Sequence, residues 1–127
     1  MHHVVAVDDS HVIRRLVEVS LQQLNLTVTQ AGDGTSAQAA LLAEPPDLLI
    51  LDVGLPDMTG WDVLRFVRAE PALDGLPVVM LTGYNDGDDF DRAEAEGVSG
   101  YIVKPFRPAD LRRAVVDALH MHETTPT

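Results

Sequence analysis

The sequence has no cysteine, which excludes disulfide bonds and thiol chemistry. No run approaches the roughly 18 consecutive apolar residues of a membrane span, so we expect no membrane insertion. Only His2 and His3 stand ahead of the first apolar run, without the basic segment and cleavage site of an export signal. These absences favour a cytoplasmic protein.

Basic residues are also scarce. The chain has 9 of them against 20 acidic residues, for a formal net charge of -11. Such a charge opposes binding to the phosphate backbone of nucleic acid, so we expect no direct contact with DNA or RNA. Solubility alone accounts for most of the carboxylates. With 127 residues, 46% of them hydrophobic, the chain fits one domain that buries its own core.

One apolar run organises the rest of the chain. It extends from Leu48 to Leu51 and stops on Asp52, and the chain-breaking residues Gly54, Pro56 and Gly60 follow. A strand that is apolar on both faces is buried on both, as in the centre of a parallel sheet covered by helices. Asp52 is therefore expected at the carboxyl end of a central strand, where open α/β sheets hold their ligands.

Strand-like and helix-like segments alternate strictly along the chain. The predicted strands span residues 4–7, 26–31, 48–51, 78–81 and 100–103, and the predicted helices span residues 11–24, 35–43, about 59–69, 86–96 and 108 onward. The alternation predicts an α/β fold, (βα)5, with a doubly wound five-stranded parallel sheet between two layers of helices. The strand at 26–31 alternates apolar and polar residues, which indicates an edge position. Residues 70–77 are predicted to form a loop.

Two of the predicted helices carry particular expectations. Ser10 is placed to cap the helix that begins at His11. The helix at 86–96 offers little more apolar surface than Phe90, Ala93 and Ala95. We expect little burial to hold this helix in place, and therefore a mobile helix.

Polar residues follow four of the predicted strands. They are Asp8, Asp9, Asp52, Thr82 and Lys104. Each alone is explained as a cap or turn residue, but five of them at successive strand ends indicate a site. If the strand order is 2-1-3-4-5, the three aspartates share one crevice. Neighbouring carboxylates repel one another unless a cation compensates their charge. Their oxygen atoms are ligands that suit magnesium.

The same residues are suited to phosphoryl transfer. Asp52 is the candidate nucleophile and would form an acyl phosphate. Lys104 supplies a positive charge and Thr82 a hydroxyl donor for the phosphoryl oxygens. The peptide bond between Lys104 and Pro105 can be cis, and a cis bond there would turn Lys104 into the site.

At this point the residues resemble the receiver domain of bacterial two-component response regulators, the family that includes the single-domain chemotaxis regulator. The matching motifs are Asp8-Asp9, Asp52-Val-Gly-Leu-Pro56 with Gly60, Thr82-Gly83 and Lys104-Pro-Phe106, and the match runs from about Val4 to Leu119. The resemblance implies a flavodoxin-like fold and a phosphorylation-controlled switch that takes a phosphoryl group from the phosphohistidine of a histidine kinase onto Asp52. By the same resemblance, Asp9, Asp52 and the carbonyl of Gly54 would bind Mg²⁺, with Asp8 acting through water.

The resemblance also implies how the signal would leave the site. Thr82 and Tyr101 match the family's switch pair, which remodels the face formed by the fourth helix, the fifth strand and the fifth helix. For Tyr101, simple packing at a strand edge remains an equal alternative. Gly54 and Tyr84 flank the phosphoryl group, and because Gly54 has no side chain to orient an attacking water, we predict slow self-dephosphorylation.

Two other functions stay open at this stage. One is an interaction module that works without phosphate, although such a module has no physical need of the carboxylate cluster. The other is a phosphatase with an aspartyl nucleophile, but such enzymes usually carry a second acid two residues later, where this chain has Gly54. We therefore expect a phosphoacceptor signalling domain that only phosphorylates and dephosphorylates itself.

Partners and domain limits follow from the same reading. Residues 1–122 are predicted to form the receiver domain, and residues 123–127 a polar tail or the start of a linker. The expected partners are a histidine kinase or phosphotransfer protein and a downstream protein that the sequence does not identify. The chain is expected to be a monomer or a phosphorylation-linked dimer, and none of its histidines has the setting of a phosphodonor.

Overall fold

The computed structural model describes residues 2–83 and 87–123. The strands are β1 (His2–Val7), β2 (Leu26–Ala31), β3 (Leu48–Asp52), β4 (Val78–Thr82) and β5 (Gly100–Val103). The helices are α1 (His11–Leu21), α2 (Gly34–Ala43), α3 (Gly60–Ala69), the 3-10 helix η1 (Pro71–Leu73), α4 (Gly87–Ala95) and α5 (Pro108–Glu123). Among these described residues, no helix has both the length and the apolar character needed to cross a membrane.

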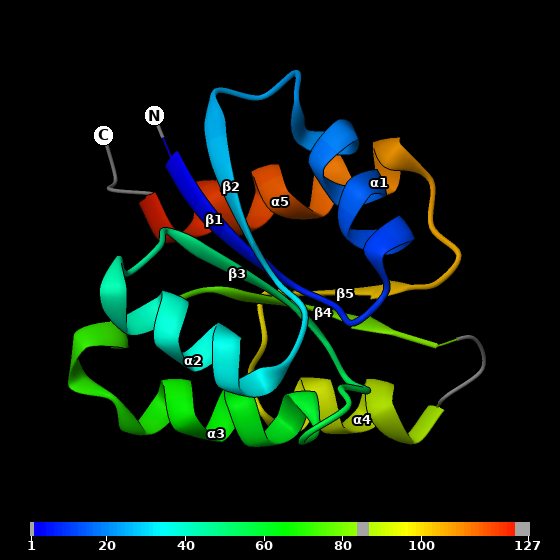
Figure 1. The fold of residues 1–127 in the computed structure, drawn as a ribbon. Helices are drawn as coiled ribbons and strands as arrows, with labels where there is room; N and C mark the ends of the chain where they lie inside the picture. Colours follow the sequence, from blue (N-terminus) through cyan, green and yellow to red (C-terminus); the bar gives the residue numbers. More distant parts are fainter. Residues whose placement is uncertain (1, 84–86, 124–127) are drawn as a thin grey trace.

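All five strands are parallel and lie in the order β2-β1-β3-β4-β5. Helices α1 and α5 cover one face of the sheet, and α2, α3 and α4 cover the other (Figure 1). The predicted α/β fold, with strand order 2-1-3-4-5 and helices on both faces, is confirmed. The strand order reverses between β1 and β3, so the edge of the sheet beyond these two strands is where such a fold holds its ligands.

The central strand divides its side chains between two cores. Leu49 and Leu51 pack with the α2 and α3 layer, and Leu48 and Ile50 pack with the α1 and α5 layer. All five residues of β3 are buried, which confirms the prediction of a strand covered on both faces. Strand β2, in contrast, has alternating burial and lies at the edge, also as predicted.

Two boundaries differ from the prediction. Helix α1 ends at Leu21 instead of residue 24, because the chain turns there and the Leu24 N–H donates to the carbonyl of Leu21. Leu24 still packs against the core, which is why the apolar spacing continued past the end of the helix. Residues 71–73, predicted as part of a loop, form η1, with Pro71 at its first position and the Glu70 side chain as its cap.

Gly60 permits the tight turn that follows β3. Its N–H donates to the carbonyl of Val53 over 2.6 Å, and a Cβ atom at this position would lie 2.2 Å from the carbonyl oxygen of Asp52. Thr59 then begins α3 through a capping box with Asp62. Only glycine lets the start of α3 lie this close to the main chain of Asp52, so Gly60 sets the path by which the loop returns to the end of β3.

Replacing Gly60 by alanine is therefore expected to destabilise the fold. Gly60→Ala should lower the free energy of unfolding by about 2 kcal/mol or more, because the clash is with main chain that has no rotamer to change. Urea unfolding followed by circular dichroism measures this. Gly83→Ala is the matched control, because a Cβ atom there meets nothing within 4 Å, and it should stay within about 0.5 kcal/mol of the parent. Equal effects of the two variants would contradict this account.

Candidate functional site

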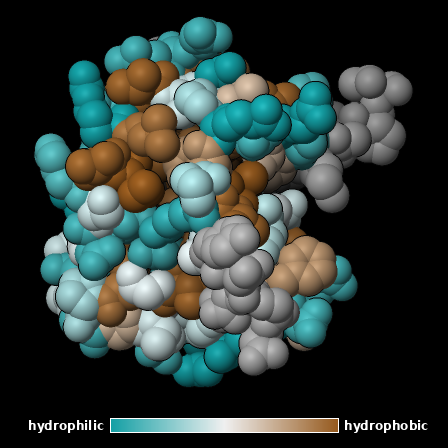
Figure 2. Space-filling model, turned by 90° about the vertical axis from the view of Figure 1, so that its right-hand side faces the viewer, coloured by the Kyte–Doolittle hydropathy of each residue, from teal (hydrophilic) through white to brown (hydrophobic). Residues whose placement is uncertain are grey.

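The strand ends bring the predicted site residues to one edge of the sheet. Asp8 follows β1, Asp52 ends β3, Thr82 ends β4 and Lys104 follows β5. Asp8, Asp52 and Thr82 are 1%, 5% and 0% exposed, whereas Asp9 is exposed. Figure 2 shows the molecule from this side, with hydrophilic residues over much of the face and hydrophobic residues gathered at its upper left. The site thus combines buried polar groups with one carboxylate open to solvent.

Lys104 joins the two buried carboxylates. Its Nζ atom lies 2.7 Å from Oδ2 of Asp8 and 3.1 Å from Oδ1 of Asp52. Burial lowers the pKa of Lys104, but the hydrogen bond to Asp8 and the charges of both carboxylates outweigh it and raise the pKa above its usual value. Lys104, the only lysine in the sequence, is therefore held protonated at the centre of the site.

The surroundings of Asp52 disfavour its ionised form. Burial raises its pKa above the usual 3.8, and the negative charge of Asp8 raises it further. The charge and hydrogen bond of Lys104 and the N–H of Gly54 oppose this shift without cancelling it. A further positive charge near Asp52 would therefore favour its ionised form.

The three aspartates could hold a metal ion. Asp8, Asp9 and Asp52 each offer one carboxylate oxygen, and these oxygens all lie within 4.8 Å of one another. The single positive charge of Lys104 does not balance three negative charges, so the cluster keeps a net negative charge when ionised. Oxygen donors, small separations and this excess charge fit a hard divalent cation such as Mg²⁺.

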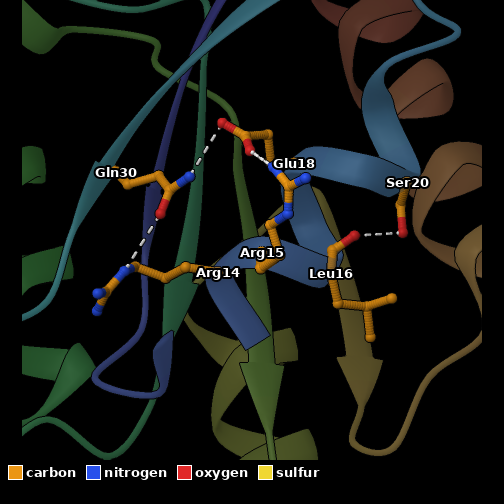
Figure 3. Close-up of polar contacts among 6 residues, drawn as sticks. All are labelled: Arg14, Arg15, Leu16, Glu18, Ser20 and Gln30. Carbon is orange, nitrogen blue, oxygen red and sulfur yellow. Dashed lines mark hydrogen bonds and ion pairs between the residues drawn. The ribbon is translucent and has the colours of Figure 1, made fainter. Parts of the chain in front are cut away.

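A polar network behind the site holds the main chain at Asp8. Arg14 donates from Nη1 to the carbonyl of Asp8 over 2.7 Å and from Nε to Oε1 of Gln30 over 3.3 Å. Gln30 in turn donates to Glu18 over 3.2 Å, so side chains of α1 and β2 meet in one chain of hydrogen bonds (Figure 3). Ser10 caps α1 as predicted, by accepting from the Ile13 N–H.

The role of Arg14 was missed in the sequence. It is a charged residue among the polar positions of α1, yet it is partly buried against Gly32 and reaches back to the site. Nothing in the local pattern distinguishes an arginine that points to solvent from one that turns toward a neighbouring loop. Asp57 was missed for the same reason, and accepts three hydrogen bonds from the start of α2.

Three other predicted residues lie around the site. The peptide bond between Lys104 and Pro105 is cis, as the sequence allowed. Tyr101 is partly buried, and its ring meets that of Phe90 edge to face with centroids 5.2 Å apart. Gly54 is exposed two residues beyond Asp52, in a bridge with Thr59. Tyr84 lies outside the described residues.

The sequence matches the family model of the response regulator receiver domain over residues 4–116. The chain belongs to this family. The chemotaxis protein CheY of Pseudomonas aeruginosa is 40% identical over 113 residues, which are 88% of this chain and 91% of that protein. The probable transcriptional regulatory protein TcrX of Mycobacterium tuberculosis is 42% identical over 103 residues, but this receiver domain spans only 43% of its length.

Solved structures agree with the sequence comparison. The chemotaxis response regulator CheY4 of Vibrio cholerae has 35% sequence identity and a TM-score of 0.85, over 93% of this chain and 98% of its own. A putative response regulator of Chloroflexus aurantiacus has 31% identity and a TM-score of 0.88 over 93% of this chain. The receiver domain described here therefore has the CheY-like flavodoxin fold, and its class is that of two-component signalling domains.

The electrostatics of this receiver domain predict that removing the charge of Asp52 stabilises the metal-free protein. The pKa of Asp52 is raised above 3.8 in the folded protein. Between the unfolded-state and folded-state pKa values, the folded protein therefore binds more protons than the unfolded chain, and its stability falls as the pH rises. Asp52→Asn should lack this fall and gain about 1 kcal/mol at neutral pH.

Thermal unfolding in EDTA between pH 4 and 8 is the measurement for this prediction. Asp9→Asn is the matched control, since its carboxylate belongs to the same cluster but is exposed, and it should gain less. A metal-free Asp52→Asn protein less stable than the parent at neutral pH would show that the ion pair with Lys104 outweighs burial.

Proposed function

We propose that this receiver domain is a phosphorylation-controlled switch that accepts a phosphoryl group on Asp52. The donor would be the phosphohistidine of a histidine kinase or phosphotransfer protein in the cytoplasm. The observation that carries the proposal is the buried pair of Asp8 and Asp52 bridged by Lys104 at the end of the central strands. A structural role alone does not account for two buried carboxylates within reach of one ammonium group, since such clusters are costly to bury.

The proposed transfer is a single displacement at phosphorus. A carboxylate oxygen of Asp52 forms the new O–P bond, the P–N bond to the donor imidazole breaks, and the departing ring nitrogen receives a proton. Lys104, already within 3.1 Å of Asp52, would pair with a phosphoryl oxygen, and the buried Thr82 hydroxyl would donate to another. Positioning and charge compensation supply most of what such a transfer requires.

Magnesium is the proposed cofactor. Asp9, Asp52 and the carbonyl of Gly54 would hold it, with Asp8 contributing through water, and the bound ion would offset the negative charge of carboxylates and phosphoryl oxygens. The close-set carboxylate oxygens of the cluster support this assignment. Self-phosphorylation and self-dephosphorylation would be the only chemistry of the domain.

The output of the switch would be a change at the face formed by α4, β5 and α5. Thr82 at the end of β4 and Tyr101 in β5 are the proposed switch pair, and the phosphoryl group would bias them by contacts that only the phosphorylated state can make. The downstream partner would be a protein, and phosphorylation could also favour a dimer through this face. Nucleic acid is not a proposed ligand.

Intact mass tests the central step. After incubation with Mg²⁺ and phosphoramidate or acetyl phosphate, the protein should gain one phosphoryl group of about 80 Da, because the small donor supplies the same phosphorus electrophile. The gain should disappear in EDTA and in Asp52→Ala. Asp74→Ala, which removes an exposed carboxylate next to η1, should label as fully as the parent.

Three outcomes would contradict the proposal. Absence of any adduct with both donors would favour a phosphate-independent interaction module. Continuous release of inorganic phosphate from an unrelated phosphomonoester would instead favour a phosphatase. An adduct that persists in Asp52→Ala would place the phosphoryl group on another residue.

The lifetime of the phosphoryl group is a separate prediction. We expect self-dephosphorylation to be slow, with a half-life of minutes or longer, because Gly54 offers no side chain to orient water. Gly54→Asn should shorten the half-life about tenfold by supplying an amide there, and space is available, since a Cβ atom at Gly54 meets nothing within 4 Å. Mass spectrometry after removal of the donor measures the decay, with Asp74→Ala, at an exposed position next to η1, as control. A parent half-life of seconds contradicts the prediction.

A further inference from the structure

The loop after Asp52 is tied to a helix that is distant in the sequence. Asp57, near the tip of this loop, accepts through Oδ1 from the Gly34 N–H over 2.8 Å. Its Oδ2 accepts from the N–H and the hydroxyl of Thr35 over 3.0 Å and 2.8 Å. These donors are the first residues of α2, so one carboxylate joins the β3–α3 loop to the start of another helix.

The next residue strengthens the same contact. A Cβ atom on Gly34 would come within 2.4 Å of the Met58 side chain, so only glycine lets Met58 lie directly against the start of α2. Gln38, one turn further along α2, donates to the Met58 sulfur over 3.7 Å. Two successive loop residues, one charged and one apolar, therefore meet the same helix end.

Other contacts join the two arms of the loop to each other. Gly54 and Thr59 form an antiparallel bridge, and the Gly60 N–H donates to the carbonyl of Val53. The Asp57 hydrogen bonds, together with the contact of Met58, oppose a tilt of the joined arms toward or away from α2. They also hold the carboxylate ionised, because the Gly34 N–H, followed by the Thr35 hydroxyl, lowers the pKa of Asp57.

We propose that Asp57 is a positioning residue for the magnesium site: by holding the loop tip on α2, it fixes the orientation of the Gly54–Thr59 bridge and, with it, the Gly54 carbonyl. The inference rests on the proposed function, in which the carbonyl of Gly54 is a metal ligand. A side-chain ligand can adjust by changing rotamer, whereas a main-chain carbonyl can only follow its loop. Groups behind metal ligands change metal affinity by about 10- to 100-fold when removed.

Helix capping alone does not explain Asp57. Helix α2 already has its own N-cap, Asp33, whose carboxylate accepts from the Ser36 N–H over 2.7 Å. Asp33 precedes the helix directly, whereas Asp57 reaches it from 23 residues away in the sequence. The two carboxylates serve the same helix end, but only Asp57 connects that end to the loop of the site. Asp33 is therefore the matched control for Asp57.

The test measures Mg²⁺ binding to the metal-free protein by calorimetry, without any phosphodonor. Asp57→Ala should weaken the Mg²⁺ affinity about tenfold, and Asp33→Ala should change it less than about twofold. Both variants should lower the melting temperature in EDTA by a few degrees, about 4 °C each, because each removes acceptors for helix N–H groups. Asp57→Asn keeps one acceptor oxygen and should fall between the parent and Asp57→Ala.

A second readout separates metal binding from transfer. With phosphoramidate at saturating Mg²⁺, the maximal phosphorylation rate of Asp57→Ala should come within about threefold of the parent, because Asp57 acts on the loop and not on the phosphoryl group. If Asp57→Ala fails to fold, the same comparison is made with Asp57→Asn, whose affinity must then fall measurably below that of Asp33→Ala.

The outcomes distinguish this inference from the function on which it rests. If the parent and Asp33→Ala bind Mg²⁺ and become phosphorylated while the Asp57 variants bind Mg²⁺ equally tightly, Asp57 is only a helix cap and the inference is overturned alone. If the parent neither binds Mg²⁺ nor takes a phosphoryl group, the proposed function fails and the inference fails with it.

Discussion

The ion pairs of Lys104 with Asp8 and Asp52 are the interactions on which the rest of the site depends. Two carboxylates at the ends of adjacent strands β1 and β3 repel each other in a poorly solvated crevice, and Lys104 is the positive charge that makes their burial tolerable. Lys104 does not fully compensate the negative charge of the site, because Asp9 adds a third carboxylate and the pKa of Asp52 stays raised. The site is therefore organised to accept more positive charge, which the proposed metal ion would bring.

The fold creates this arrangement through its central strand. Strand β3 is buried on both faces and lies between β1 and β4, and each of these three strands has a polar residue at or directly after its end, at the same edge of the sheet. The main chain continues the pairing past the strands: the Val53 N–H donates to the carbonyl of Leu81, and the Lys104 N–H donates to the carbonyl of Thr82. Hydrophobic burial sets the register, and the register places the charges.

The residue pattern was sufficient for the parallel sheet and for the positions of Asp8, Asp52, Thr82 and Lys104, whereas the strand order came with the family resemblance. Parallel strands bring their carboxyl ends together, so residues directly after apolar runs could be assigned to one edge without knowing any contact. The end of α1 was placed three residues too late, because Leu24 continues the apolar spacing while packing from a turn. The roles of the site residues remain predictions.

Arg14 and Asp57 could not be assigned in the same way. Both act through main-chain partners, the carbonyl of Asp8 and the N–H groups of Gly34 and Thr35. A main-chain group has no signature in the sequence, and a hydrophobic pattern says nothing about which loop a polar side chain will turn toward. Residues that contact main-chain groups near the site are therefore identified only from the structure. The residues of the candidate site itself could be predicted, because they stand at the ends of strands.

Helix α4 shows how a weakly buried element can still be connected to the site. Among its described side chains, only Ala93 is buried, which confirms the expected scarcity of core contacts. Two ring contacts also involve its described side chains: the Phe90 ring meets Tyr101, and the Arg92 guanidinium lies 4.7 Å from the Trp61 ring centre.

Both aromatic partners of α4 are close to site residues in the sequence. Tyr101 lies in β5 three residues before Lys104, and Trp61 is the second residue of α3, after the loop that follows Asp52. Aromatic and cation–π contacts at partly exposed positions contribute about 0.5 to 1.5 kcal/mol each. Charge-assisted hydrogen bonds to a phosphoryl group are of similar or greater strength. If Lys104 and Thr82 bind a phosphoryl group as proposed, the new contacts would be at least as strong as the ring contacts that hold α4.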